Sequence, residues 1–159
     1  MTTIEALAEK DQPTAVFAAL EQEVQNSVGA KLFTIMTLDR EADLARRHYS
    51  NMPEAYPSGG SKPMLHNAWA DQVIHRHQNF MANSIEEIAE VFPDHELIQS
   101  LGCESCLNIP IVFKGLVIGT LNLLDRAGYF TPERVAKAES LKTSGALALL
   151  VAMQTKEAS

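Results

Sequence analysis

Cys103 and Cys106, spaced Cys-x-x-Cys, are the residues whose types and spacing first suggest chemistry in this chain. Redox-active thiol pairs and half-sites for zinc use this spacing. A zinc site needs a second ligand pair, and only Asp94 and His95 lie nearby in the sequence. We therefore interpret both cysteines as small buried residues, with a redox pair as the alternative.

A second set of candidate residues is polar and isolated within an apolar stretch. It comprises Cys106, Asn108, Thr120 and Asn122. Buried polar groups need hydrogen-bonding partners, and a small-molecule pocket combines apolar walls with a few such groups. We predict that these four residues line a ligand site. The alternative is that they hydrogen-bond one another or nearby loop backbone.

Aromatic residues complete the predicted ligand-binding set: Tyr49, Tyr56, Trp69 and Phe80. Tyr56 is the best candidate for a gate, because it lies in a stretch rich in proline and glycine. Trp69 lies at a helical apolar position, which favours the core, and a pocket wall is the alternative. Lys62, close to Gly59 and Gly60, is a weak indication of an acidic ligand.

Other catalytic patterns are missing from the sequence. His75 and His77 are two residues apart, so they do not share a helix face, and we interpret them as a solvated helix end. No Ser-His-Asp, HExxH or P-loop pattern is present. We predict no catalytic residue and no metal site, and the sequence leaves any cofactor open.

These candidate residues require a β-hairpin to position them. Residues 104–113 and 116–125 are β-rich runs joined by Lys114-Gly115, and two such runs around a two-residue turn ending in glycine predict a hairpin. Side chains alternate between the two faces of a strand, which places Cys106 and Asn108 on one face and Leu107 and Ile109 on the other. Both faces are rich in apolar residues, so both must be covered.

The remaining pattern predicts the elements that cover this hairpin. We expect a helix from about residue 14 that ends at Gly29, then strands over 31–39 and 44–50. Residues 51–63 contain three prolines and a glycine pair and should form a long functional loop. Helices over 64–77, from the cap at Ser84, from a cap at Asp94 to Gly102, and from Thr131 to about 156 complete the set, with 80–82 extended.

The expected fold is α+β, with a central antiparallel sheet of five or six strands. The terminal helices should cover one face of this sheet. The 51–63 loop and the helices of 64–101 should roof a pocket on the other face. The last helix is apolar nearly all round over 145–153, which predicts cover by the N-terminal helix, a second subunit, or both.

Length and composition restrict the class of protein. The 159 residues fit one domain, 1–159 with a core over about 14–153. A net charge of −7 argues against nucleic acid as the main partner. No apolar run reaches membrane-spanning length, and two cysteines without a visible targeting segment favour a reducing compartment, so we expect a cytoplasmic protein.

The hairpin also resembles the C-terminal signature of GAF domains. The resemblance rests on Gly102, Ser105, the apolar strand ending in Pro110-Ile111, the turn at Gly115, and the return strand Val117-Ile118-Gly119-Thr120-Leu121. It covers roughly residues 14–153. The run 56–63 is similar to a subgroup of free-standing bacterial GAF proteins.

This resemblance implies a sensory module that binds a small molecule of unknown identity between the sheet and its roof. It also implies a homodimer formed through the terminal helices. One enzymatic branch, the free methionine-R-sulfoxide reductases, would require a reactive cysteine on the roof and acids in the pocket. At the positions where that branch carries acids, this chain has Cys106, Asn122 and Leu124, and these departures count against the activity. A thiol enzyme using Cys103 or Cys106 is kept as an alternative. A ligand-free dimerisation module is the third.

Overall fold

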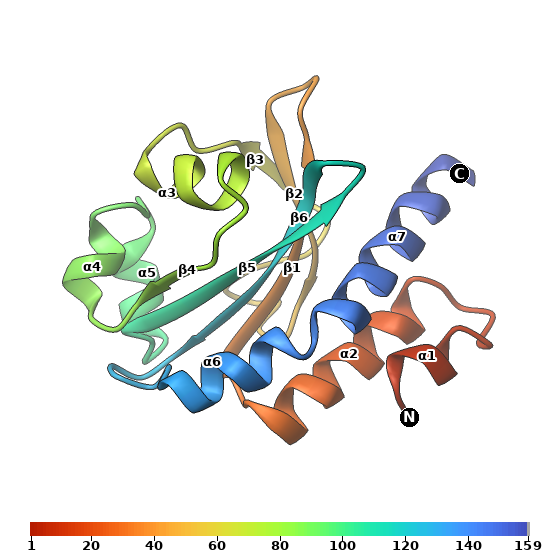
Figure 1. Cartoon of the computed structure of the whole chain (residues 1–159), viewed down its shortest axis with the longest axis horizontal. Coiled ribbons are helices and arrows are strands. Elements are labelled where there is room, and N and C mark those ends of the chain that lie inside the picture. The colour runs from red at the N-terminus through yellow and green to blue at the C-terminus, as the bar shows by residue number, and fades with distance from the viewer. Residues whose placement is uncertain (159) are drawn as a thin grey trace.

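One antiparallel sheet of six strands, in the order β3-β2-β1-β6-β5-β4, forms the centre of the protein in a computed structural model (Figure 1). The structure describes residues 1–158, with side chains as far as residue 155. The strands are β1 (Leu32–Asp39), β2 (Leu44–Ser50), β3 (Ser61–Pro63), β4 (Phe80–Ala82), β5 (Ser105–Phe113) and β6 (Leu116–Asp125).

Helices cover both faces of this sheet. They are α1 (Thr3–Ala6), α2 (Thr14–Ser27), α3 (Ala68–Ala70), a π-helical turn η1 (Asp71–His75), α4 (Ile85–Ala89), α5 (His95–Ser100), α6 (Pro132–Glu139) and α7 (Lys142–Ala158). Figure 1 shows α1, α2, α6 and α7 together on one face and α3, α4 and α5 on the other. The predicted α+β architecture, with terminal helices on one face, is confirmed. We call the two sides the helix face and the roof face.

The central hairpin forms as predicted. Lys114 and Gly115 have φ angles of 54° and 78°, the pair of positive values that a type I′ turn requires. Asn108 pairs with Asn122 across β5 and β6, and Pro110 pairs with Thr120. The register set by the turn holds only for Phe113 with Leu116 and Val112 with Val117, after which a β-bulge shifts it by one residue and Ile111 pairs with Gly119. This bulge brings the two asparagines side by side, because a one-residue shift changes which side chains share a face.

Close packing on the helix face depends on glycine at two positions. A Cβ atom on Gly119 of β6 would lie 2.2 Å from the main-chain oxygen of Met36 on β1 and 3.1 Å from a Leu149 methyl of α7. A Cβ atom on Gly145 of α7 would lie 2.7 Å from a Leu121 methyl. Both glycines therefore let α7 approach the sheet closely.

Three predicted elements differ from those observed. Residues 61–63 form β3, at the edge of the sheet, where proline is tolerated because no further strand needs its missing N–H. The helix expected over 64–77 shrinks to α3 and η1, after the Asn67 side chain caps the amide of Ala70. Residues 64–67 run beside the β1–β2 turn instead.

The helix expected from Thr131 to about 156 is interrupted. It divides into α6 and α7 around Ser140 and Leu141. A continuous helix of that length would run about 40 Å and outreach the sheet. The break lets α6 pack on α2 while α7 packs on β5, β6, α1 and α2. None of the helices in residues 1–158 is both long and apolar enough to cross a bilayer.

Candidate functional site

A cavity of about 80 Å³ lies between the roof face of the sheet and the segments that cover it. Because a single water needs roughly 10–15 Å³ on this measure, the space holds several waters or a small organic molecule. Its apolar walls include Leu32, Met36, Leu38, Ala45, Pro63, Met64, Leu65, Trp69, Ile74, Phe92, Ile98 and Leu124. Its polar lining comprises Thr34, Arg47, Tyr56, Lys62, Asp94, Cys106, Asn108, Thr120 and Asn122.

At one end of the cavity, neutral polar groups form a hydrogen-bonded chain across three strands. The indole Nε1 of Trp69 donates to Oδ1 of Asn108 at 2.9 Å, and Nδ2 of Asn108 donates to Oδ1 of Asn122 at 2.8 Å. Nδ2 of Asn122 then donates to the hydroxyl of Thr34 at 3.1 Å. For Asn108 and Asn122, the alternative prediction is therefore correct: these side chains hydrogen-bond each other and neighbouring side chains. The chain also fixes Trp69 of the roof to the sheet.

Thr120 differs from the asparagines beside it. Its side chain is buried and lines the cavity, but no described residue hydrogen-bonds its hydroxyl. The amides of Asn108 and Asn122 bond each other, whereas the Thr120 hydroxyl has no partner among the described residues. The floor of the cavity therefore has one polar group available for a new hydrogen bond. The hydroxyl of Thr120 can donate or accept a hydrogen bond there.

The other end of the cavity carries charged groups. The hydroxyl of Tyr56 donates to Oδ2 of Asp94 at 2.6 Å, so the carboxylate that we expected to cap α5 is bonded to the loop instead. The guanidinium of Arg47 lies 4.7 Å from the centroid of the Tyr56 ring and donates to the carbonyl oxygen of Pro57 at 3.2 Å. Burial, with the hydrogen bond to Asp94, raises the pKa of Tyr56 far above its usual value, which keeps the phenol protonated.

Lys62 enters the cavity from the edge strand β3. Burial lowers the pKa of its ammonium, Asp94 opposes that shift, and Arg47 adds to it. The Lys62 side chain has no hydrogen-bond or ion-pair partner among the described residues. Lys62, weakly indicated by the sequence as a residue for an acidic ligand, thus lines the cavity.

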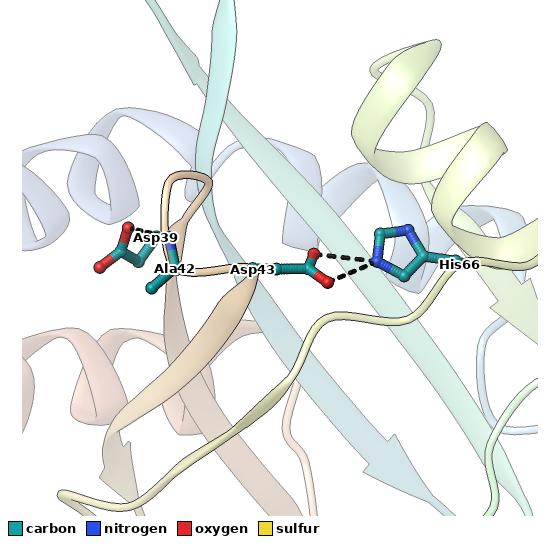
Figure 2. Close-up of polar contacts among 4 residues, drawn as sticks. All are labelled: Asp39, Ala42, Asp43 and His66. Atoms are coloured by element: carbon teal, nitrogen blue, oxygen red, sulfur yellow. Dashed lines mark hydrogen bonds and ion pairs between the residues drawn. The ribbon is translucent and has the colours of Figure 1, made fainter.

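The roof is tied to the turn between β1 and β2 as well as to the floor. Figure 2 shows Nε2 of His66 facing both carboxylate oxygens of Asp43, each at 2.9 Å, while Asp39 accepts from the amide of Ala42 on the same turn. The amide of Met64 donates to the carbonyl oxygen of Asp43 at 3.0 Å. The His66 and Asp43 side chains are 66% and 56% exposed, so solvent weakens this link.

The two cysteines are buried and unpaired. Because β5 begins at Ser105, alternation does not apply to Cys103, and both cysteines belong to the same apolar cluster on the roof face. Burial raises the pKa of Cys103 to about 11 and that of Cys106 to about 12. A thiolate is the reactive form of cysteine, so this environment disfavours nucleophilic chemistry at neutral pH.

Six of the eight predicted site residues come together at the cavity: Tyr56, Trp69, Cys106, Asn108, Thr120 and Asn122. Tyr49 does not. It packs on the helix face against Phe17 and Phe33, and its hydroxyl donates to Glu21. The cause is a β-bulge at His48: Ile35 pairs with Tyr49 and Met36 with Arg47, so Tyr49 turns to the face opposite Arg47.

Phe80 also lies outside the cavity lining. It packs behind the wall against Phe92, at 6.2 Å between ring centroids. Sequence reasoning missed Thr34, Arg47 and Asp94 as site residues. Thr34 was missed because its pairing with Asn122 joins β1 to β6, and the pattern of one strand does not show which strand lies beside it. Alternation along β2 was the one available signal for Arg47, because Ala45 and Arg47 share a face.

Metal-binding residues do not gather in the described part of the chain. No group of three or more His, Cys, Asp or Glu side chains there could hold an ion. His75 and His77 are exposed, as expected for a solvated helix end.

Comparison with known proteins identifies the fold. The GAF domain of a two-component sensor histidine kinase from Bacillus halodurans superposes with a TM-score of 0.69 at 16% identity, covering 91% of this chain and 98% of that one. The GAF domain of a phosphoenolpyruvate-protein phosphotransferase from Coxiella burnetii gives 0.69 at 16% identity, covering 99% and 92%. The chromophore-binding domain of a bacteriophytochrome from R. palustris gives 0.68 at 13% identity, covering 98% and 59%.

Comparison with curated protein sequences gives no match. The sequence does match the GAF domain family over residues 11–149, which is most of the chain. The protein therefore belongs to the GAF domain family.

Proposed function

We propose that this protein is a sensory GAF module that binds a small metabolite between the sheet and its roof. The observation that carries this proposal is the cavity of about 80 Å³ with apolar walls, a free hydroxyl on Thr120 and charged groups at one end. A well-formed apolar pocket with a few convergent polar groups is the usual form of a small-molecule site. GAF domains in general are sensory or regulatory modules of signalling proteins, which supports the same role.

The strands that form the cavity floor offer a route for the signal. β5 and β6 contact η1 on the roof face and α7 on the helix face. A ligand that orders residues 51–63 and shifts Trp69 would therefore act on strands that also support α7. The terminal helices are the proposed output.

A homodimer through the terminal helices is part of this proposal. α1 and α2 already contact α7, yet Leu147, Leu150 and Val151 of α7 stay partly exposed. Light scattering across a concentration series tests the dimer. A monomer at all concentrations would leave ligand binding standing and remove the dimer.

A binding role fits the cysteines better than a catalytic one. Both thiols are buried, and their raised pKa values leave little thiolate at neutral pH. We expect a Cys103→Ser, Cys106→Ser double variant to have the same negligible sulfoxide-dependent thiol oxidation as the wild type.

Thermal-shift screening against a metabolite library tests the binding proposal. Ligand that binds only the folded state raises the melting temperature by mass action, and at a hundred times its dissociation constant it adds about 2.7 kcal/mol to stability. Ala45→Met fills the cavity wall and should remove the shift. Ala42→Met, the same substitution in the exposed turn, should keep it. No shift across nucleotides, amino acids and aromatic compounds would contradict the proposal.

A further inference from the structure

The charge inside the cavity is unbalanced. Two cationic side chains, Arg47 and Lys62, line it, against one carboxylate, Asp94. That carboxylate already accepts a hydrogen bond from Tyr56. Among the described side chains, none of the ion pairs within 4 Å involves Arg47 or Lys62. The cavity of an acidic protein with a net charge of −7 thus carries one excess positive charge.

Arg47 has hydrogen-bonding capacity to spare. A guanidinium carries five N–H donors, and the structure gives this one a single acceptor, the carbonyl oxygen of Pro57. Its Nε is buried and has no partner. A buried donor without a partner is costly, so such a group normally has an acceptor in the working state of a protein.

Lys62 presents the same deficit from the neighbouring strand. Lys62 pairs with Ala45 in the β2–β3 ladder, two residues from Arg47 along β2, so both cations enter the cavity from the same edge of the sheet. Burial of its ammonium without an ion pair is unfavourable, and although Asp94 acts against the shift, the pKa stays lowered and reflects that cost.

We propose that the cavity takes a small organic monoanion, a carboxylate with an apolar body, whose charged group meets Arg47 and Lys62. The proposal rests on the proposed function and names the ligand class for that same site. The apolar body lies against the Trp69 and Met36 side of the cavity. A single negative charge cancels the excess of two cations over one carboxylate, whereas the second charge of a phosphate monoester would be left without a partner.

The chain contains its own reporter and a matched control. Trp69 is the only tryptophan, and it lines the cavity. Arg46 is adjacent to Arg47 and also has an unpartnered Nε, but it lies in a separate groove on the opposite face with Thr37 and His48. Arg46→Met therefore removes the same charge from the same strand without touching the cavity.

The experiment titrates Trp69 fluorescence with matched probes: hexanoate, hexanamide and hexyl phosphate, then cyclohexanecarboxylate, cyclohexanecarboxamide and cyclohexyl phosphate. In the wild type we expect each carboxylate to bind at least about tenfold more tightly than its amide and its phosphate, as a charge-assisted hydrogen bond allows. Lys62→Met and Arg47→Met should each abolish the preference for carboxylate over amide. Arg46→Met should preserve it.

Equal binding of acid and amide would overturn the proposal while leaving a small-molecule sensor intact. Tighter binding of the phosphates would overturn the single charge. No response to any of the six probes would overturn the ligand class, and the library screen with Ala45→Met then decides separately whether the cavity binds anything.

If Arg47→Met unfolds the 51–63 loop, the melting temperature of the ligand-free protein tests the excess positive charge instead. Lys62→Met keeps all but one atom of the side-chain length and removes a buried charge that has no ion pair within 4 Å with any described side chain, so we expect the melting temperature of the ligand-free protein to rise. A fall would mean that the ammonium is already neutralised, which overturns the proposal.

Discussion

Tyr49 and Tyr56 each donate a hydrogen bond to a carboxylate, Glu21 and Asp94 respectively, from opposite faces of one sheet. On the helix face, Tyr49 packs against Phe17 and Phe33 at the edge of the apolar cluster. On the roof face, Tyr56 borders a cavity and lies beside Arg47. Burial raises the pKa of both phenols. The same kind of bond therefore lies against the core on one side of the sheet and borders the cavity on the other.

The contrast extends to the way each face is packed. The apolar residues of the helix face form one large cluster that extends from α2 through β1, β5 and β6 to α6 and α7. The roof face divides its apolar residues between two smaller clusters, one around Cys103 and Cys106 and the other around Trp69. A split core leaves room between its parts, and polar groups and charges line that room. Stability is thus expected to depend on the helix face and binding on the roof face.

Leu123 and Leu124, adjacent on β6, test this division with the largest expected effect. Leu123 lies in the helix-face cluster, and Leu124 borders the cavity. Leucine-to-alanine changes in cores cost about 2–5 kcal/mol, more where the site cannot collapse. We expect Leu123→Ala near the upper end and Leu124→Ala near the lower, because Leu124 has fewer neighbours to lose. Urea denaturation measures both, and equal losses would break the comparison.

Alkaline titration should weaken the roof face next. The thiols of Cys103 and Cys106 ionise in the unfolded chain near pH 9.0 but in the folded protein only at about 11 and about 12. Their contribution is complete below pH 9.0 and is lost as pH rises toward those folded values, by about 1.4 kcal/mol per pH unit for each thiol.

The tyrosines shift in the same direction, so the cysteine share must be isolated. A Cys103→Ala, Cys106→Ala variant should lose less stability than the wild type between pH 9.0 and about 11, as judged by urea denaturation at each pH. Parallel losses would mean that neither thiol is protected by burial.

Removing one hydroxyl from each face gives a smaller and sharper comparison. Tyr49→Phe and Tyr56→Phe each delete one hydrogen bond to a carboxylate and should cost about 1–3 kcal/mol. Only Tyr56→Phe should alter Trp69 fluorescence and the thermal response to carboxylate probes, because Tyr56 lines the cavity. An identical change in ligand response for Tyr49→Phe would show that the faces are coupled more tightly than their packing indicates.

The smallest expected effect concerns the roof anchor at His66. His66→Ala removes an exposed contact with Asp43 and should change stability by less than about 1 kcal/mol. Asp43 has a φ of 55°, a conformation that asparagine tolerates, so Asp43→Asn is the matched variant from the other side. Thermal denaturation of both variants checks this, and a loss above that size would make the anchor a structural element of the roof.

Local sequence features predicted the parts of the fold that depend on neighbours in the chain. Lys114-Gly115 specifies the turn, alternation puts Cys106 with Asn108 on one face of β5 and Thr120 with Asn122 on one face of β6, and Thr131 with Pro132 starts α6. Turn chemistry, capping and the two-residue period of a strand act over a few residues. They can be recognised without knowing what packs above them.

Contacts between distant segments decided the rest of the site. Asp94 had the sequence context of a helix cap, but Tyr56 reaches it across 38 positions. Alternation along β2 alone would place Tyr49 on the same face as Arg47. The bulge opposite Ile35 and Met36 places it on the other face. A bulge depends on pairing with the neighbouring strand, and a loop contact depends on where the roof rests. Neither leaves a mark in the local pattern.

By itself the sequence determined a hairpin and the alternation of polar groups along each of its strands, because alternation and turn geometry are properties of a few adjacent residues. The β-bulge between β5 and β6, a feature of strand pairing, brings those polar groups to the same face. Only the tertiary structure decided that Arg47, Lys62 and Asp94 meet above those groups. They come from β2, β3 and the start of α5, and their approach is set by how the roof packs on the sheet. Electrostatic balance in the cavity is a sum over those distant groups, so it exists only once the chain has folded.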